Sequence, residues 1–309
     1  MDVQIGQLRC FLAVAEHQHF TRAARELGLA QPSVSALVRR LEGDVGTELF
    51  HRTRARVSLT AAGEALLPYA RRIIADVDAA QTQLQEVGGL ARGRLAIGAT
   101  PSLTASLVPP LLARFHAAYP RIELALREAG SEDLVAAVEE GAVDVALVIL
   151  PVRHEILETQ PLLREELVLA VADGHPLAKR RTIAVSDLRD VPLVMFREGY
   201  DLRSATEAAC RAAGFAPTFA IDGGEMDGVL RLTAAGLGAA IVPSIVVAQA
   251  SAVRAVRIAQ PTLTRTIGLA HRRDRPLSRA GQELVDTVRT LVRDRSWLEH
   301  APPGLTALG

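Results

Sequence analysis

The spacing of apolar residues at the start of the chain predicts three short helices. Between residues 7 and 16, apolar side chains recur three or four positions apart, as one helix face requires, at Leu8, Phe11, Leu12 and Ala15. A second helix is expected after Thr21, a residue type that can cap it, and it should end near Gly28. Residues 31 to 42 repeat the spacing. A tight turn therefore separates the last two helices.

A short hairpin and a long helix are predicted next. The segment from 48 to 60 has β-prone ends around a polar middle that carries Arg52, Arg54 and Arg56 and no acidic residue. From Thr60 the apolar periodicity continues to the glycine pair at 88 and 89, which predicts a helix of about 27 residues, roughly 40 Å long. A small domain cannot cover so long an apolar stripe, so we expect it to pair with a second copy of itself.

Beyond residue 93 the pattern changes to alternating strands and helices. Apolar β-rich runs lie at residues 94–98, 122–127, 144–149, 167–172, 193–196, 218–221 and 238–242. Helical patterns separate them, at about 103–118, 131–140, 203–213 and 225–235. This order predicts an α/β region of two successive lobes with a largely parallel sheet. A late strand is expected over 265–270, and a closing helix over 277–292 is expected to return to the first lobe.

Composition limits the classes of function. The 35 basic and 35 acidic residues cancel, so the net charge does not indicate nucleic-acid binding. Evidence for such binding must come from the local distribution of charge. Cys10 and Cys210 lie too far apart in sequence for a disulfide scaffold or zinc site, and two buried thiols in a reducing cytoplasm are expected. Neither a signal peptide nor a membrane span is predicted. No catalytic motif, metal site or cofactor site is recognised, so the chain is not expected to be an enzyme.

The polar side of residues 31 to 42 suits DNA recognition. In a helix-turn-helix, the second helix lies in the major groove. The apolar stripe of this helix leaves on its other side Gln31, Pro32, Ser33, Ser35, Ala36, Arg39 and Arg40. Glutamine can pair with adenine, serine with bases or phosphates, and arginine with guanine or the backbone. A solvated helix face explains this pattern equally well, but the basic hairpin that follows favours DNA binding.

Several motifs in this region have a familiar order and spacing. They are Phe11-Leu12-Ala13-Val14-Ala15-Glu16, Phe20-Thr21-Arg22-Ala23-Ala24, Leu29-Ala30-Gln31-Pro32-Ser33-Val34-Ser35, Leu41-Glu42, Leu49-Phe50-His51-Arg52 and Leu59-Thr60-Ala61-Ala62-Gly63. Together they resemble the LysR-type transcriptional regulator family, and the resemblance covers essentially the whole chain. This sequence departs from the family pattern at two places. Residue 30 is alanine where serine is common, and in the predicted hairpin, which is the wing of the family, the arginine often seen at 55 is displaced to 54 and 56.

The resemblance implies a fold in three parts. Residues 1–60 would form a winged helix-turn-helix, and residues 61–90 a dimerising linker helix with a hinge. Residues 91–309 would form a regulatory domain shaped like a type II periplasmic binding protein. Its lobe I would comprise residues of about 91–165 and 269–309, and its lobe II about 166–268.

The resemblance also implies partners and contacts. Such a protein is a bacterial, cytoplasmic homodimer or homotetramer that binds double-stranded promoter DNA and a small-molecule effector, with RNA polymerase as a further partner. By position, the resemblance carries over Gln31, Pro32, Ser33, Ser35, Arg39, Arg52 and Arg54 as DNA contacts, and Thr21, Arg40 and Arg56 are expected to join them.

An effector cleft is expected between the two lobes, where strands end and helices begin. The residues at these junctions are Thr100, Pro101, Ser102 and Ser131 in the first lobe and Phe196, Arg197, Gly223 and Glu225 in the second. Ser102 and Ser131 could equally cap helices. Arg197 would pair with a carboxylate whereas Glu225 would favour an amine or hydroxyl, so the chemistry of the ligand stays open.

Two other functions fit part of the pattern. An exported solute-binding protein fits the C-terminal part but not the N-terminal 90 residues or the missing export signal. A thiol-based oxidant sensor of the same family is the main alternative, although Cys10 and Cys210 fall in different predicted domains and reversible thiol sensing usually needs a nearby resolving partner.

Overall fold

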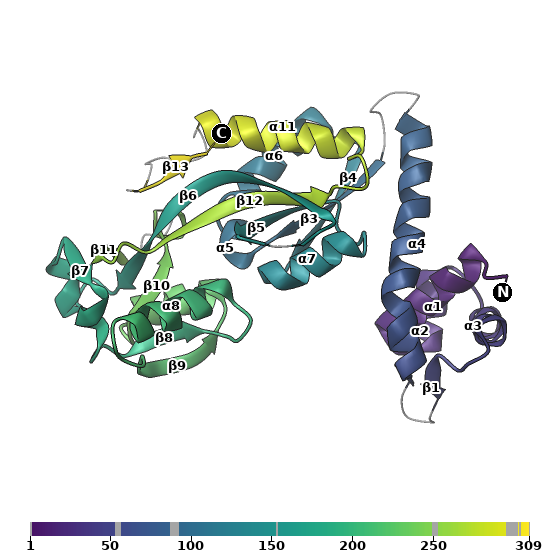
Figure 1. The fold of residues 1–309 in the computed structure, drawn as a ribbon, viewed down its shortest axis with the longest axis horizontal. Helices are drawn as coiled ribbons and strands as arrows, with labels where there is room; N and C mark the ends of the chain where they lie inside the picture. The colour runs from purple at the N-terminus through teal and green to yellow at the C-terminus, as the bar shows by residue number, and fades with distance from the viewer. Residues whose placement is uncertain are drawn as a thin grey trace. The chain divides into compact units, whose positions relative to one another are not determined.

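The computed structural model describes two compact units. The described residues are 2–52, 57–86, 93–152, 154–248, 253–294, 302 and 304–308. The first unit comprises Met1–Leu84 with Glu139–Ala142, and the second comprises Gln85–Val138 with Val143–Gly309 (Figure 1). Each unit is described on its own below.

Three helices form the core of the first unit, as the apolar spacing predicts. They are α1 (Ile5–His17), α2 (Phe20–Glu26) and α3 (Gln31–Val45). Their apolar faces meet around Phe11, whose ring centroid lies 5.3 Å from that of Phe50. Leu8, Val14, Val34, Val38 and Leu41 complete this core, and each is at most 2% exposed. The burial of these side chains from water is the main stabilisation of so small a unit.

The turn between α2 and α3 depends on Gly28. Its φ of 64° lies in the left-handed region, where a side chain is strained and glycine is not. The predicted cap of α2 is wrong by two positions, because the helix already begins at Phe20. Nδ1 of His19, not Thr21, is the capping acceptor, and the backbone N–H of Thr21 donates to it over 3.1 Å. Ala30 precedes α3 without a side-chain cap, as its residue type predicts.

The predicted hairpin and long helix follow. Strand β1 (Phe50–Arg52) pairs antiparallel with β2 (Val57–Leu59). Helix α4 (Ala61–Glu86) then begins with a cap, because the N–H of Gly63 donates to Oγ1 of Thr60 over 3.1 Å. Gly63 packs so closely that a Cβ there would lie 2.2 Å from the carbonyl oxygen of Leu49. The start of α4 is thereby fixed on the hairpin.

Helix α4 exposes a row of large apolar side chains. Tyr69, Ile73 and Leu84 are 66%, 42% and 75% exposed. At 100° per residue these positions fall within one broad face of the helix. Such a face is the seam that a partner helix covers in an oligomer.

The second unit is built on one large sheet with helices on both faces. Its strands are β3 (Gly93–Ala99), β4 (Ile122–Glu128), β5 (Val145–Leu150), β6 (Leu157–Val171), β7 (Thr182–Ala184), β10 (Ala240–Pro243), β11 (Arg254–Gln260), β12 (Thr264–Arg272) and β13 (Thr306–Ala307). The strand order is β4-β3-β5-β12-β6-β11-β7, with β10 and β13 also paired to β6.

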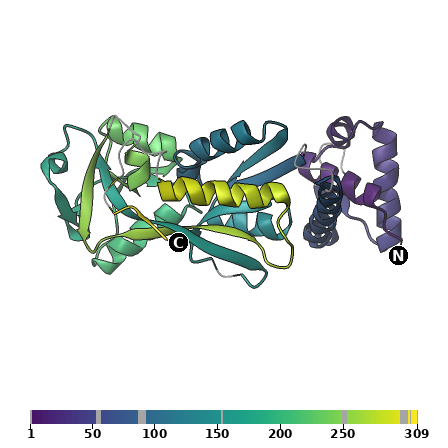
Figure 2. The same cartoon turned by 90° about the horizontal axis from the view of Figure 1, so that it is seen from above.

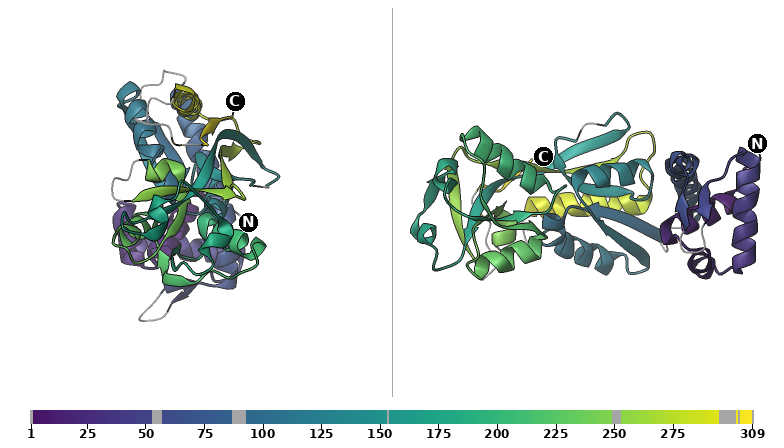
Figure 3. Two further views of the ribbon diagram at one scale, coloured as in Figure 1. Left: turned by 90° about the vertical axis from the view of Figure 1, so that its left-hand side faces the viewer. Right: turned by 90° about the horizontal axis from the view of Figure 1, so that it is seen from below.

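The lobe I half of this sheet is covered on both sides. Helices α6 (Val108–Ala118) and α11 (Arg279–Asp294) lie on one face, and α7 (Ser131–Glu139) lies on the other (Figures 1 and 3). Alternate residues of β5 accordingly enter two cores: Val145 and Leu147 join the α6 and α11 side, and Ala146 and Val148 join the α7 side. A short helix, α5 (Pro101–Thr104), follows β3.

Lobe II is formed by the far end of the large sheet and a smaller parallel sheet. Strand β8 (Leu193–Phe196) pairs with β9 (Phe219–Gly224), and helices α8 (Asp201–Ala212), α9 (Met226–Ala234) and α10 (Ser244–Val247) pack around them. Two 3₁₀ turns, Pro176–Lys179 and Val185–Leu188, flank β7.

The prediction of a largely parallel sheet is wrong. Strand β3 is parallel to β4 and β5, but β12 is antiparallel to β5 and β6, and β6 is antiparallel to β10, β11 and β13. The predicted strand at 167–172 covers only the last third of β6, whose 15 residues continue from lobe I into lobe II. Apolar runs reveal that a strand is buried but not which way its neighbour runs.

Strands β6 and β12 carry the connection between the lobes. As Figures 1 and 2 show, both extend along the unit as a long ribbon. Strand β6 pairs with β12 up to Glu166 and with β10 from Leu167 onward. The chain crosses again between β11 and β12, so the lobes are joined by two neighbouring strand crossings.

Candidate DNA interface and effector pocket

The outer face of α3 is polar and open, as predicted. Val34 and Val38 are fully buried, and the predicted contacts exposed on the opposite side are Gln31, Pro32, Ser33, Arg39 and Arg40. Thr21 is also exposed, in the first turn of α2. The first unit thus presents amide, hydroxyl and guanidinium groups together on the outer face of α3.

Ser35 does not lie on this outer face, and its placement there was wrong. It is only 9% exposed, because it adjoins the buried stripe and the side chain of Arg39 folds over it. Nη2 of Arg39 donates to Oγ of Ser35 over 3.1 Å, and Nε of Arg39 donates to its carbonyl oxygen over 3.4 Å. Ser35 therefore positions the guanidinium of Arg39.

Arg52 joins the hairpin to α3. Its guanidinium is paired with Glu42 of α3 and lies 5.2 Å from the ring centroid of Phe20. The other carboxylate oxygen of Glu42 accepts the N–H of Leu49 over 3.0 Å. Arg52 is therefore held by protein contacts at the base of the hairpin, while the predicted contacts Arg54 and Arg56 lie outside the described residues.

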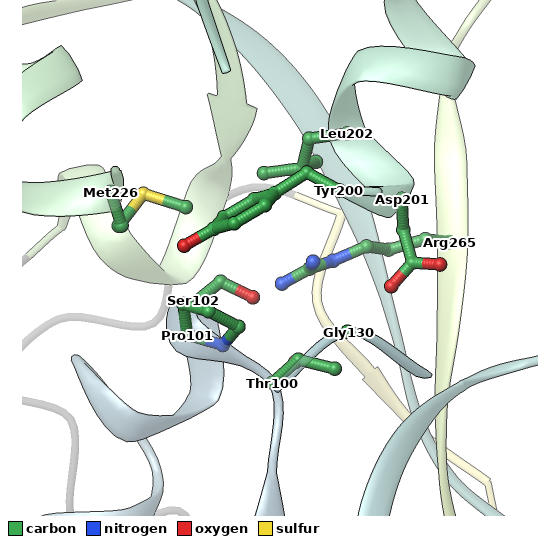
Figure 4. A pocket seen from close by; sticks show the side chains of 9 residues that line it. All are labelled: Thr100, Pro101, Ser102, Gly130, Tyr200, Asp201, Leu202, Met226 and Arg265. Atoms are coloured by element: carbon green, nitrogen blue, oxygen red, sulfur yellow. The ribbon is translucent and has the colours of Figure 1, made fainter. Parts of the chain in front are cut away.

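A pocket in the second unit collects three of the predicted effector residues. It is lined by Thr100, Pro101, Ser102, Gly130, Tyr200, Asp201, Leu202, Met226 and Arg265 (Figure 4). Its volume is about 10 Å³, which is room for the centre of roughly one water-sized sphere. The pocket is therefore narrow, with lobe I residues on one side and lobe II residues on the other.

Ser131 links the two lobes beside this pocket. Its hydroxyl donates to Oδ2 of Asp201 over 2.8 Å and accepts the N–H of Ile149 over 3.1 Å. The hydroxyl thus spans from α7 to α8. Close by, a Cβ on Gly130 would lie 2.8 Å from the carbonyl oxygen of Gly199, so the two loops can meet only because residue 130 is glycine.

Asp201, at the contact between the lobes, has a carboxyl group with a shifted pKa. Burial raises the pKa of its carboxyl group above the ordinary value of 3.8, while the hydrogen bond from Ser131 and the charge of Arg265 oppose the rise. The carboxylate is therefore costly to hold in this position at neutral pH. Perturbed titratable groups of this kind concentrate at functional sites.

The other predicted effector residues do not line the pocket. Arg197 and Glu225 are bonded to each other, with Nε of Arg197 2.6 Å from Oε1 of Glu225. Glu225 also accepts the hydroxyl of Tyr200, and burial followed by this hydrogen bond raises the pKa of Tyr200. Phe196 stacks on the Tyr200 ring at 5.4 Å, and Gly223 is exposed with a φ of 100°. This group fixes the Tyr200 side chain that forms a wall of the pocket.

A buried ion pair lies where the strands cross between the lobes. Nη2 of Arg265 on β12 is 2.7 Å from Oε1 of Glu165 on β6, and the two side chains are 6% and 0% exposed. The second oxygen of Glu165 accepts the N–H of Ile245 over 3.2 Å, at the start of α10. Figure 4 shows the Arg265 guanidinium pointing into the pocket toward Ser102. Arg265 therefore contacts both the pocket and the place where β6 and β12 pass from one lobe to the other.

Sequence reasoning missed six residues of the pocket. Five lie within or directly after segments that were singled out for the cleft, namely Gly130, Tyr200, Asp201, Leu202 and Met226. Their neighbours were chosen instead because the exact helix start decides which side chain faces the cleft. Arg265 gave no local signal, since it reaches the pocket from a strand that is distant in sequence.

Comparisons with known proteins find the same family along most of the chain. A family model described as "Bacterial regulatory helix-turn-helix protein, lysR family" matches residues 5–64, and one described as "LysR substrate binding domain" matches residues 88–293. The "Hydrogen peroxide-inducible genes activator" of Dickeya chrysanthemi is 32% identical over 290 residues, covering 93% of this chain and 95% of that protein. "Transcriptional dual regulator GltC" of Bacillus subtilis strain 168 is 31% identical over 289 residues, covering 93% and 96%.

Solved structures share the fold over nearly the full length. Full-length CbnR complexed with its target DNA has 26% identity and a TM-score of 0.69, covering 93% of this chain and 99% of that one. A full-length OxyR variant from Pseudomonas aeruginosa has 23% identity and a TM-score of 0.73, covering 98% and 100%. No helix in the described parts of the present chain is long and apolar enough to cross a membrane.

The raised pKa of Asp201 predicts a pH-dependent cost in stability. The Asp201 carboxyl group binds its proton more tightly in the folded protein than in the unfolded chain. The stability that the bound proton adds to the folded state is therefore lost as pH rises through the raised pKa. Asp201→Asn should therefore be more stable than the native chain near pH 7, and the gain should disappear as pH falls toward the ordinary pKa. Urea unfolding of the full-length protein across this pH range measures the difference.

The matched control is Asp190→Asn, which removes an exposed acid of the same lobe and should give no such gain. An Asp201→Asn protein that is less stable than the native chain at pH 7, or a difference that does not vary with pH, would contradict this assignment.

Proposed function

The chain belongs to the LysR family of bacterial transcriptional regulators, and we propose that the exposed face of α3 reads its promoter while the pocket beside Arg265 and Asp201 holds its effector. The protein is a sequence-specific DNA-binding regulator whose promoter binding is modulated by a small molecule, and it acts as an oligomer. What is proposed is the assignment of residues to these tasks.

The open polar face of α3 carries the DNA part of the proposal. Buried valines hold one side of the helix against the core, so Gln31, Ser33 and Arg40 must point outward. Gln31 and Ser33 lie in the first turn, the part of a recognition helix that meets base edges in the groove. Arg40, farther along, suits a phosphate contact, because phosphate contacts set the register of a protein on DNA.

The interlobe pocket carries the effector part. We propose that a ligand enters between Thr100 and Tyr200 and shifts the balance between open and closed lobes. Because the lobes are joined through β6 and β12, such a shift changes how regulatory domains pack in the oligomer and hence the spacing of DNA-binding units. No catalytic step is needed for this cycle, and we propose none.

The division of the chain follows from the same argument. We assign residues 1–60 to DNA binding, 61–90 to dimerisation through α4, and 91–309 to effector binding. The exposed apolar face of α4 supports pairing with a second copy. A protein that acts on bacterial promoters would work in the cytoplasm.

Thiol-based oxidant sensing is the second candidate, since several relatives are named hydrogen peroxide-inducible genes activators. In this chain Cys10 and Cys210 are 2% and 0% exposed and belong to separate units. Burial raises the pKa of both thiols, which lowers the fraction of reactive thiolate. We therefore propose that the effector is bound by the pocket and not read by these cysteines.

Substitution of single arginines tests the DNA assignment. The target duplex is first recovered by sequencing genomic DNA bound to the full-length protein. Arg40→Ala should lower the magnitude of the slope of log affinity against log salt concentration by about 1. Arg39→Ala should weaken the free energy of duplex binding by about 1–3 kcal/mol and reduce the preference for the target sequence. Fluorescence anisotropy titrations at several salt concentrations measure both. Arg211→Ala, an exposed arginine of lobe II, is the control and should bind as the native chain does. Unchanged affinity of both α3 variants would refute the assignment.

The thiol candidate is tested on the same duplex. We expect Cys210→Ser and the native protein to show the same affinity before and after treatment with hydrogen peroxide, because the thiol is buried and largely protonated. Should peroxide change the affinity of the native protein and the substitution abolish that change, the oxidant-sensing alternative would replace the pocket proposal. Cys10→Ser serves as the comparison.

A further inference from the structure

We infer that the carboxylate of Asp201 occupies the anion-binding position of the pocket from within, so that the effector of this regulator is a compact, uncharged, hydrogen-bonding molecule and not a carboxylate. The inference rests on the proposed function of the pocket and names the chemical class of its ligand.

The pocket has the features that bind anions. Helices α7, α8 and α9 all begin at it, at or next to Gly130, Asp201 and Met226. The free N–H groups and the dipole at a helix N-terminus favour negative charge. Arg265 adds a full positive charge from the strand side, and its guanidinium points into the space (Figure 4). An acidic group is therefore expected here.

Asp201 already supplies that acidic group. Its Oδ2 accepts the hydroxyl of Ser131 at the start of α7 over 2.8 Å. Arg265 has a resident partner as well, because Glu165 lies 2.7 Å from Nη2. A ligand carboxylate would meet both of these acids in a narrow, poorly solvated space. Repulsion between like charges at such distances disfavours binding of a second anion.

Two polar atoms of the pocket are left for a ligand, Oγ1 of Thr100 and Nη2 of Arg265. The second lies beside Glu165 as an ion pair, but within the described residues the hydrogen bond to Glu165 comes from Nε of Arg265. Oγ1 of Thr100 is buried, in a residue only 3% exposed, and has no hydrogen-bond partner within the described part of the chain. A buried hydroxyl without a partner is costly, and it can both donate and accept a hydrogen bond. The ring of Tyr200 and the side chains of Leu202 and Met226 provide apolar walls. Because the pocket has room for only about one water-sized sphere, a ligand must part the walls of the two lobes to enter, which favours a molecule of few non-hydrogen atoms.

Acetamide and acetate are suitable probes, because they have almost the same shape and differ in charge. The full-length protein is labelled with ¹³C at the methionine methyl groups. Met226 lines the pocket, whereas Met195 is buried in β8 and reports on the fold of lobe II. Each probe is titrated at constant ionic strength, with sodium chloride as the salt control, and the two methyl resonances are followed.

The native protein should show a saturable shift of the Met226 resonance with acetamide and none with acetate. In Asp201→Gly the missing side chain leaves a gap that acetate fits, so acetate should give a saturable shift of the Met226 resonance at a concentration at least about tenfold below the highest that leaves the native protein unchanged. Asp201→Asn, which keeps the shape and removes the charge, should change in the same direction by less. Asp190→Asn removes an exposed acid of lobe II and should keep the native preference. An unchanged Met195 resonance shows that a variant is folded.

Three results would overturn the inference: acetate shifting Met226 of the native protein as strongly as acetamide, acetamide having no effect on it, or Asp201→Gly gaining no affinity for acetate. Duplex binding is measured on the same samples. Loss of duplex binding with the expected probe pattern would count against the proposed function alone. Normal duplex binding with the wrong probe pattern would count against the ligand class alone.

Discussion

The buried ion pair between Glu165 and Arg265 is the constraint on which the architecture of the second unit depends. Two charges in a low-dielectric interior are stable only when each keeps its partner, so β6 and β12 must hold this register. Glu165 also binds the start of α10, and Arg265 reaches into the pocket. Removing one partner alone would leave an uncompensated buried charge, at a cost of about 3–5 kcal/mol. The pair therefore fixes the orientation of one lobe relative to the other.

The same constraint explains why the pocket is polar at its base and apolar on its walls. Strands that cross between the lobes bring Arg265 beneath the starts of α7, α8 and α9. Asp201 and Ser131 then close the gap between the lobes. A ligand that replaces part of this network changes contacts on both lobes at once. That is the requirement for a binding event to shift a conformational equilibrium.

Local patterns in the sequence were sufficient for the first unit and insufficient for the pocket. The helices, the Gly28 turn, the hairpin and the exposed side of α3 follow from spacing and residue type, since each depends on neighbours a few residues away. The burial of Ser35 could not be predicted, because it depends on the conformation of the Arg39 side chain. The direction of β12 and the place of Arg265 depend on long-range strand pairing, which periodicity does not encode. Thr100 and Ser102 were found because strand ends and helix starts mark clefts in two-lobed folds.

The distance between the lobes tests the role of the ion pair most directly. Spin labels at the exposed positions Ala136 of α7 and Ala212 of α8, with Cys10 and Cys210 replaced by alanine, report it by double electron-electron resonance in full-length protein diluted with unlabelled chain. The native pair should give one narrow distance distribution. The double variant Glu165→Gln, Arg265→Met, which leaves no unpaired buried charge, should give a broad or shifted one. Identical distributions in the two proteins would contradict the account.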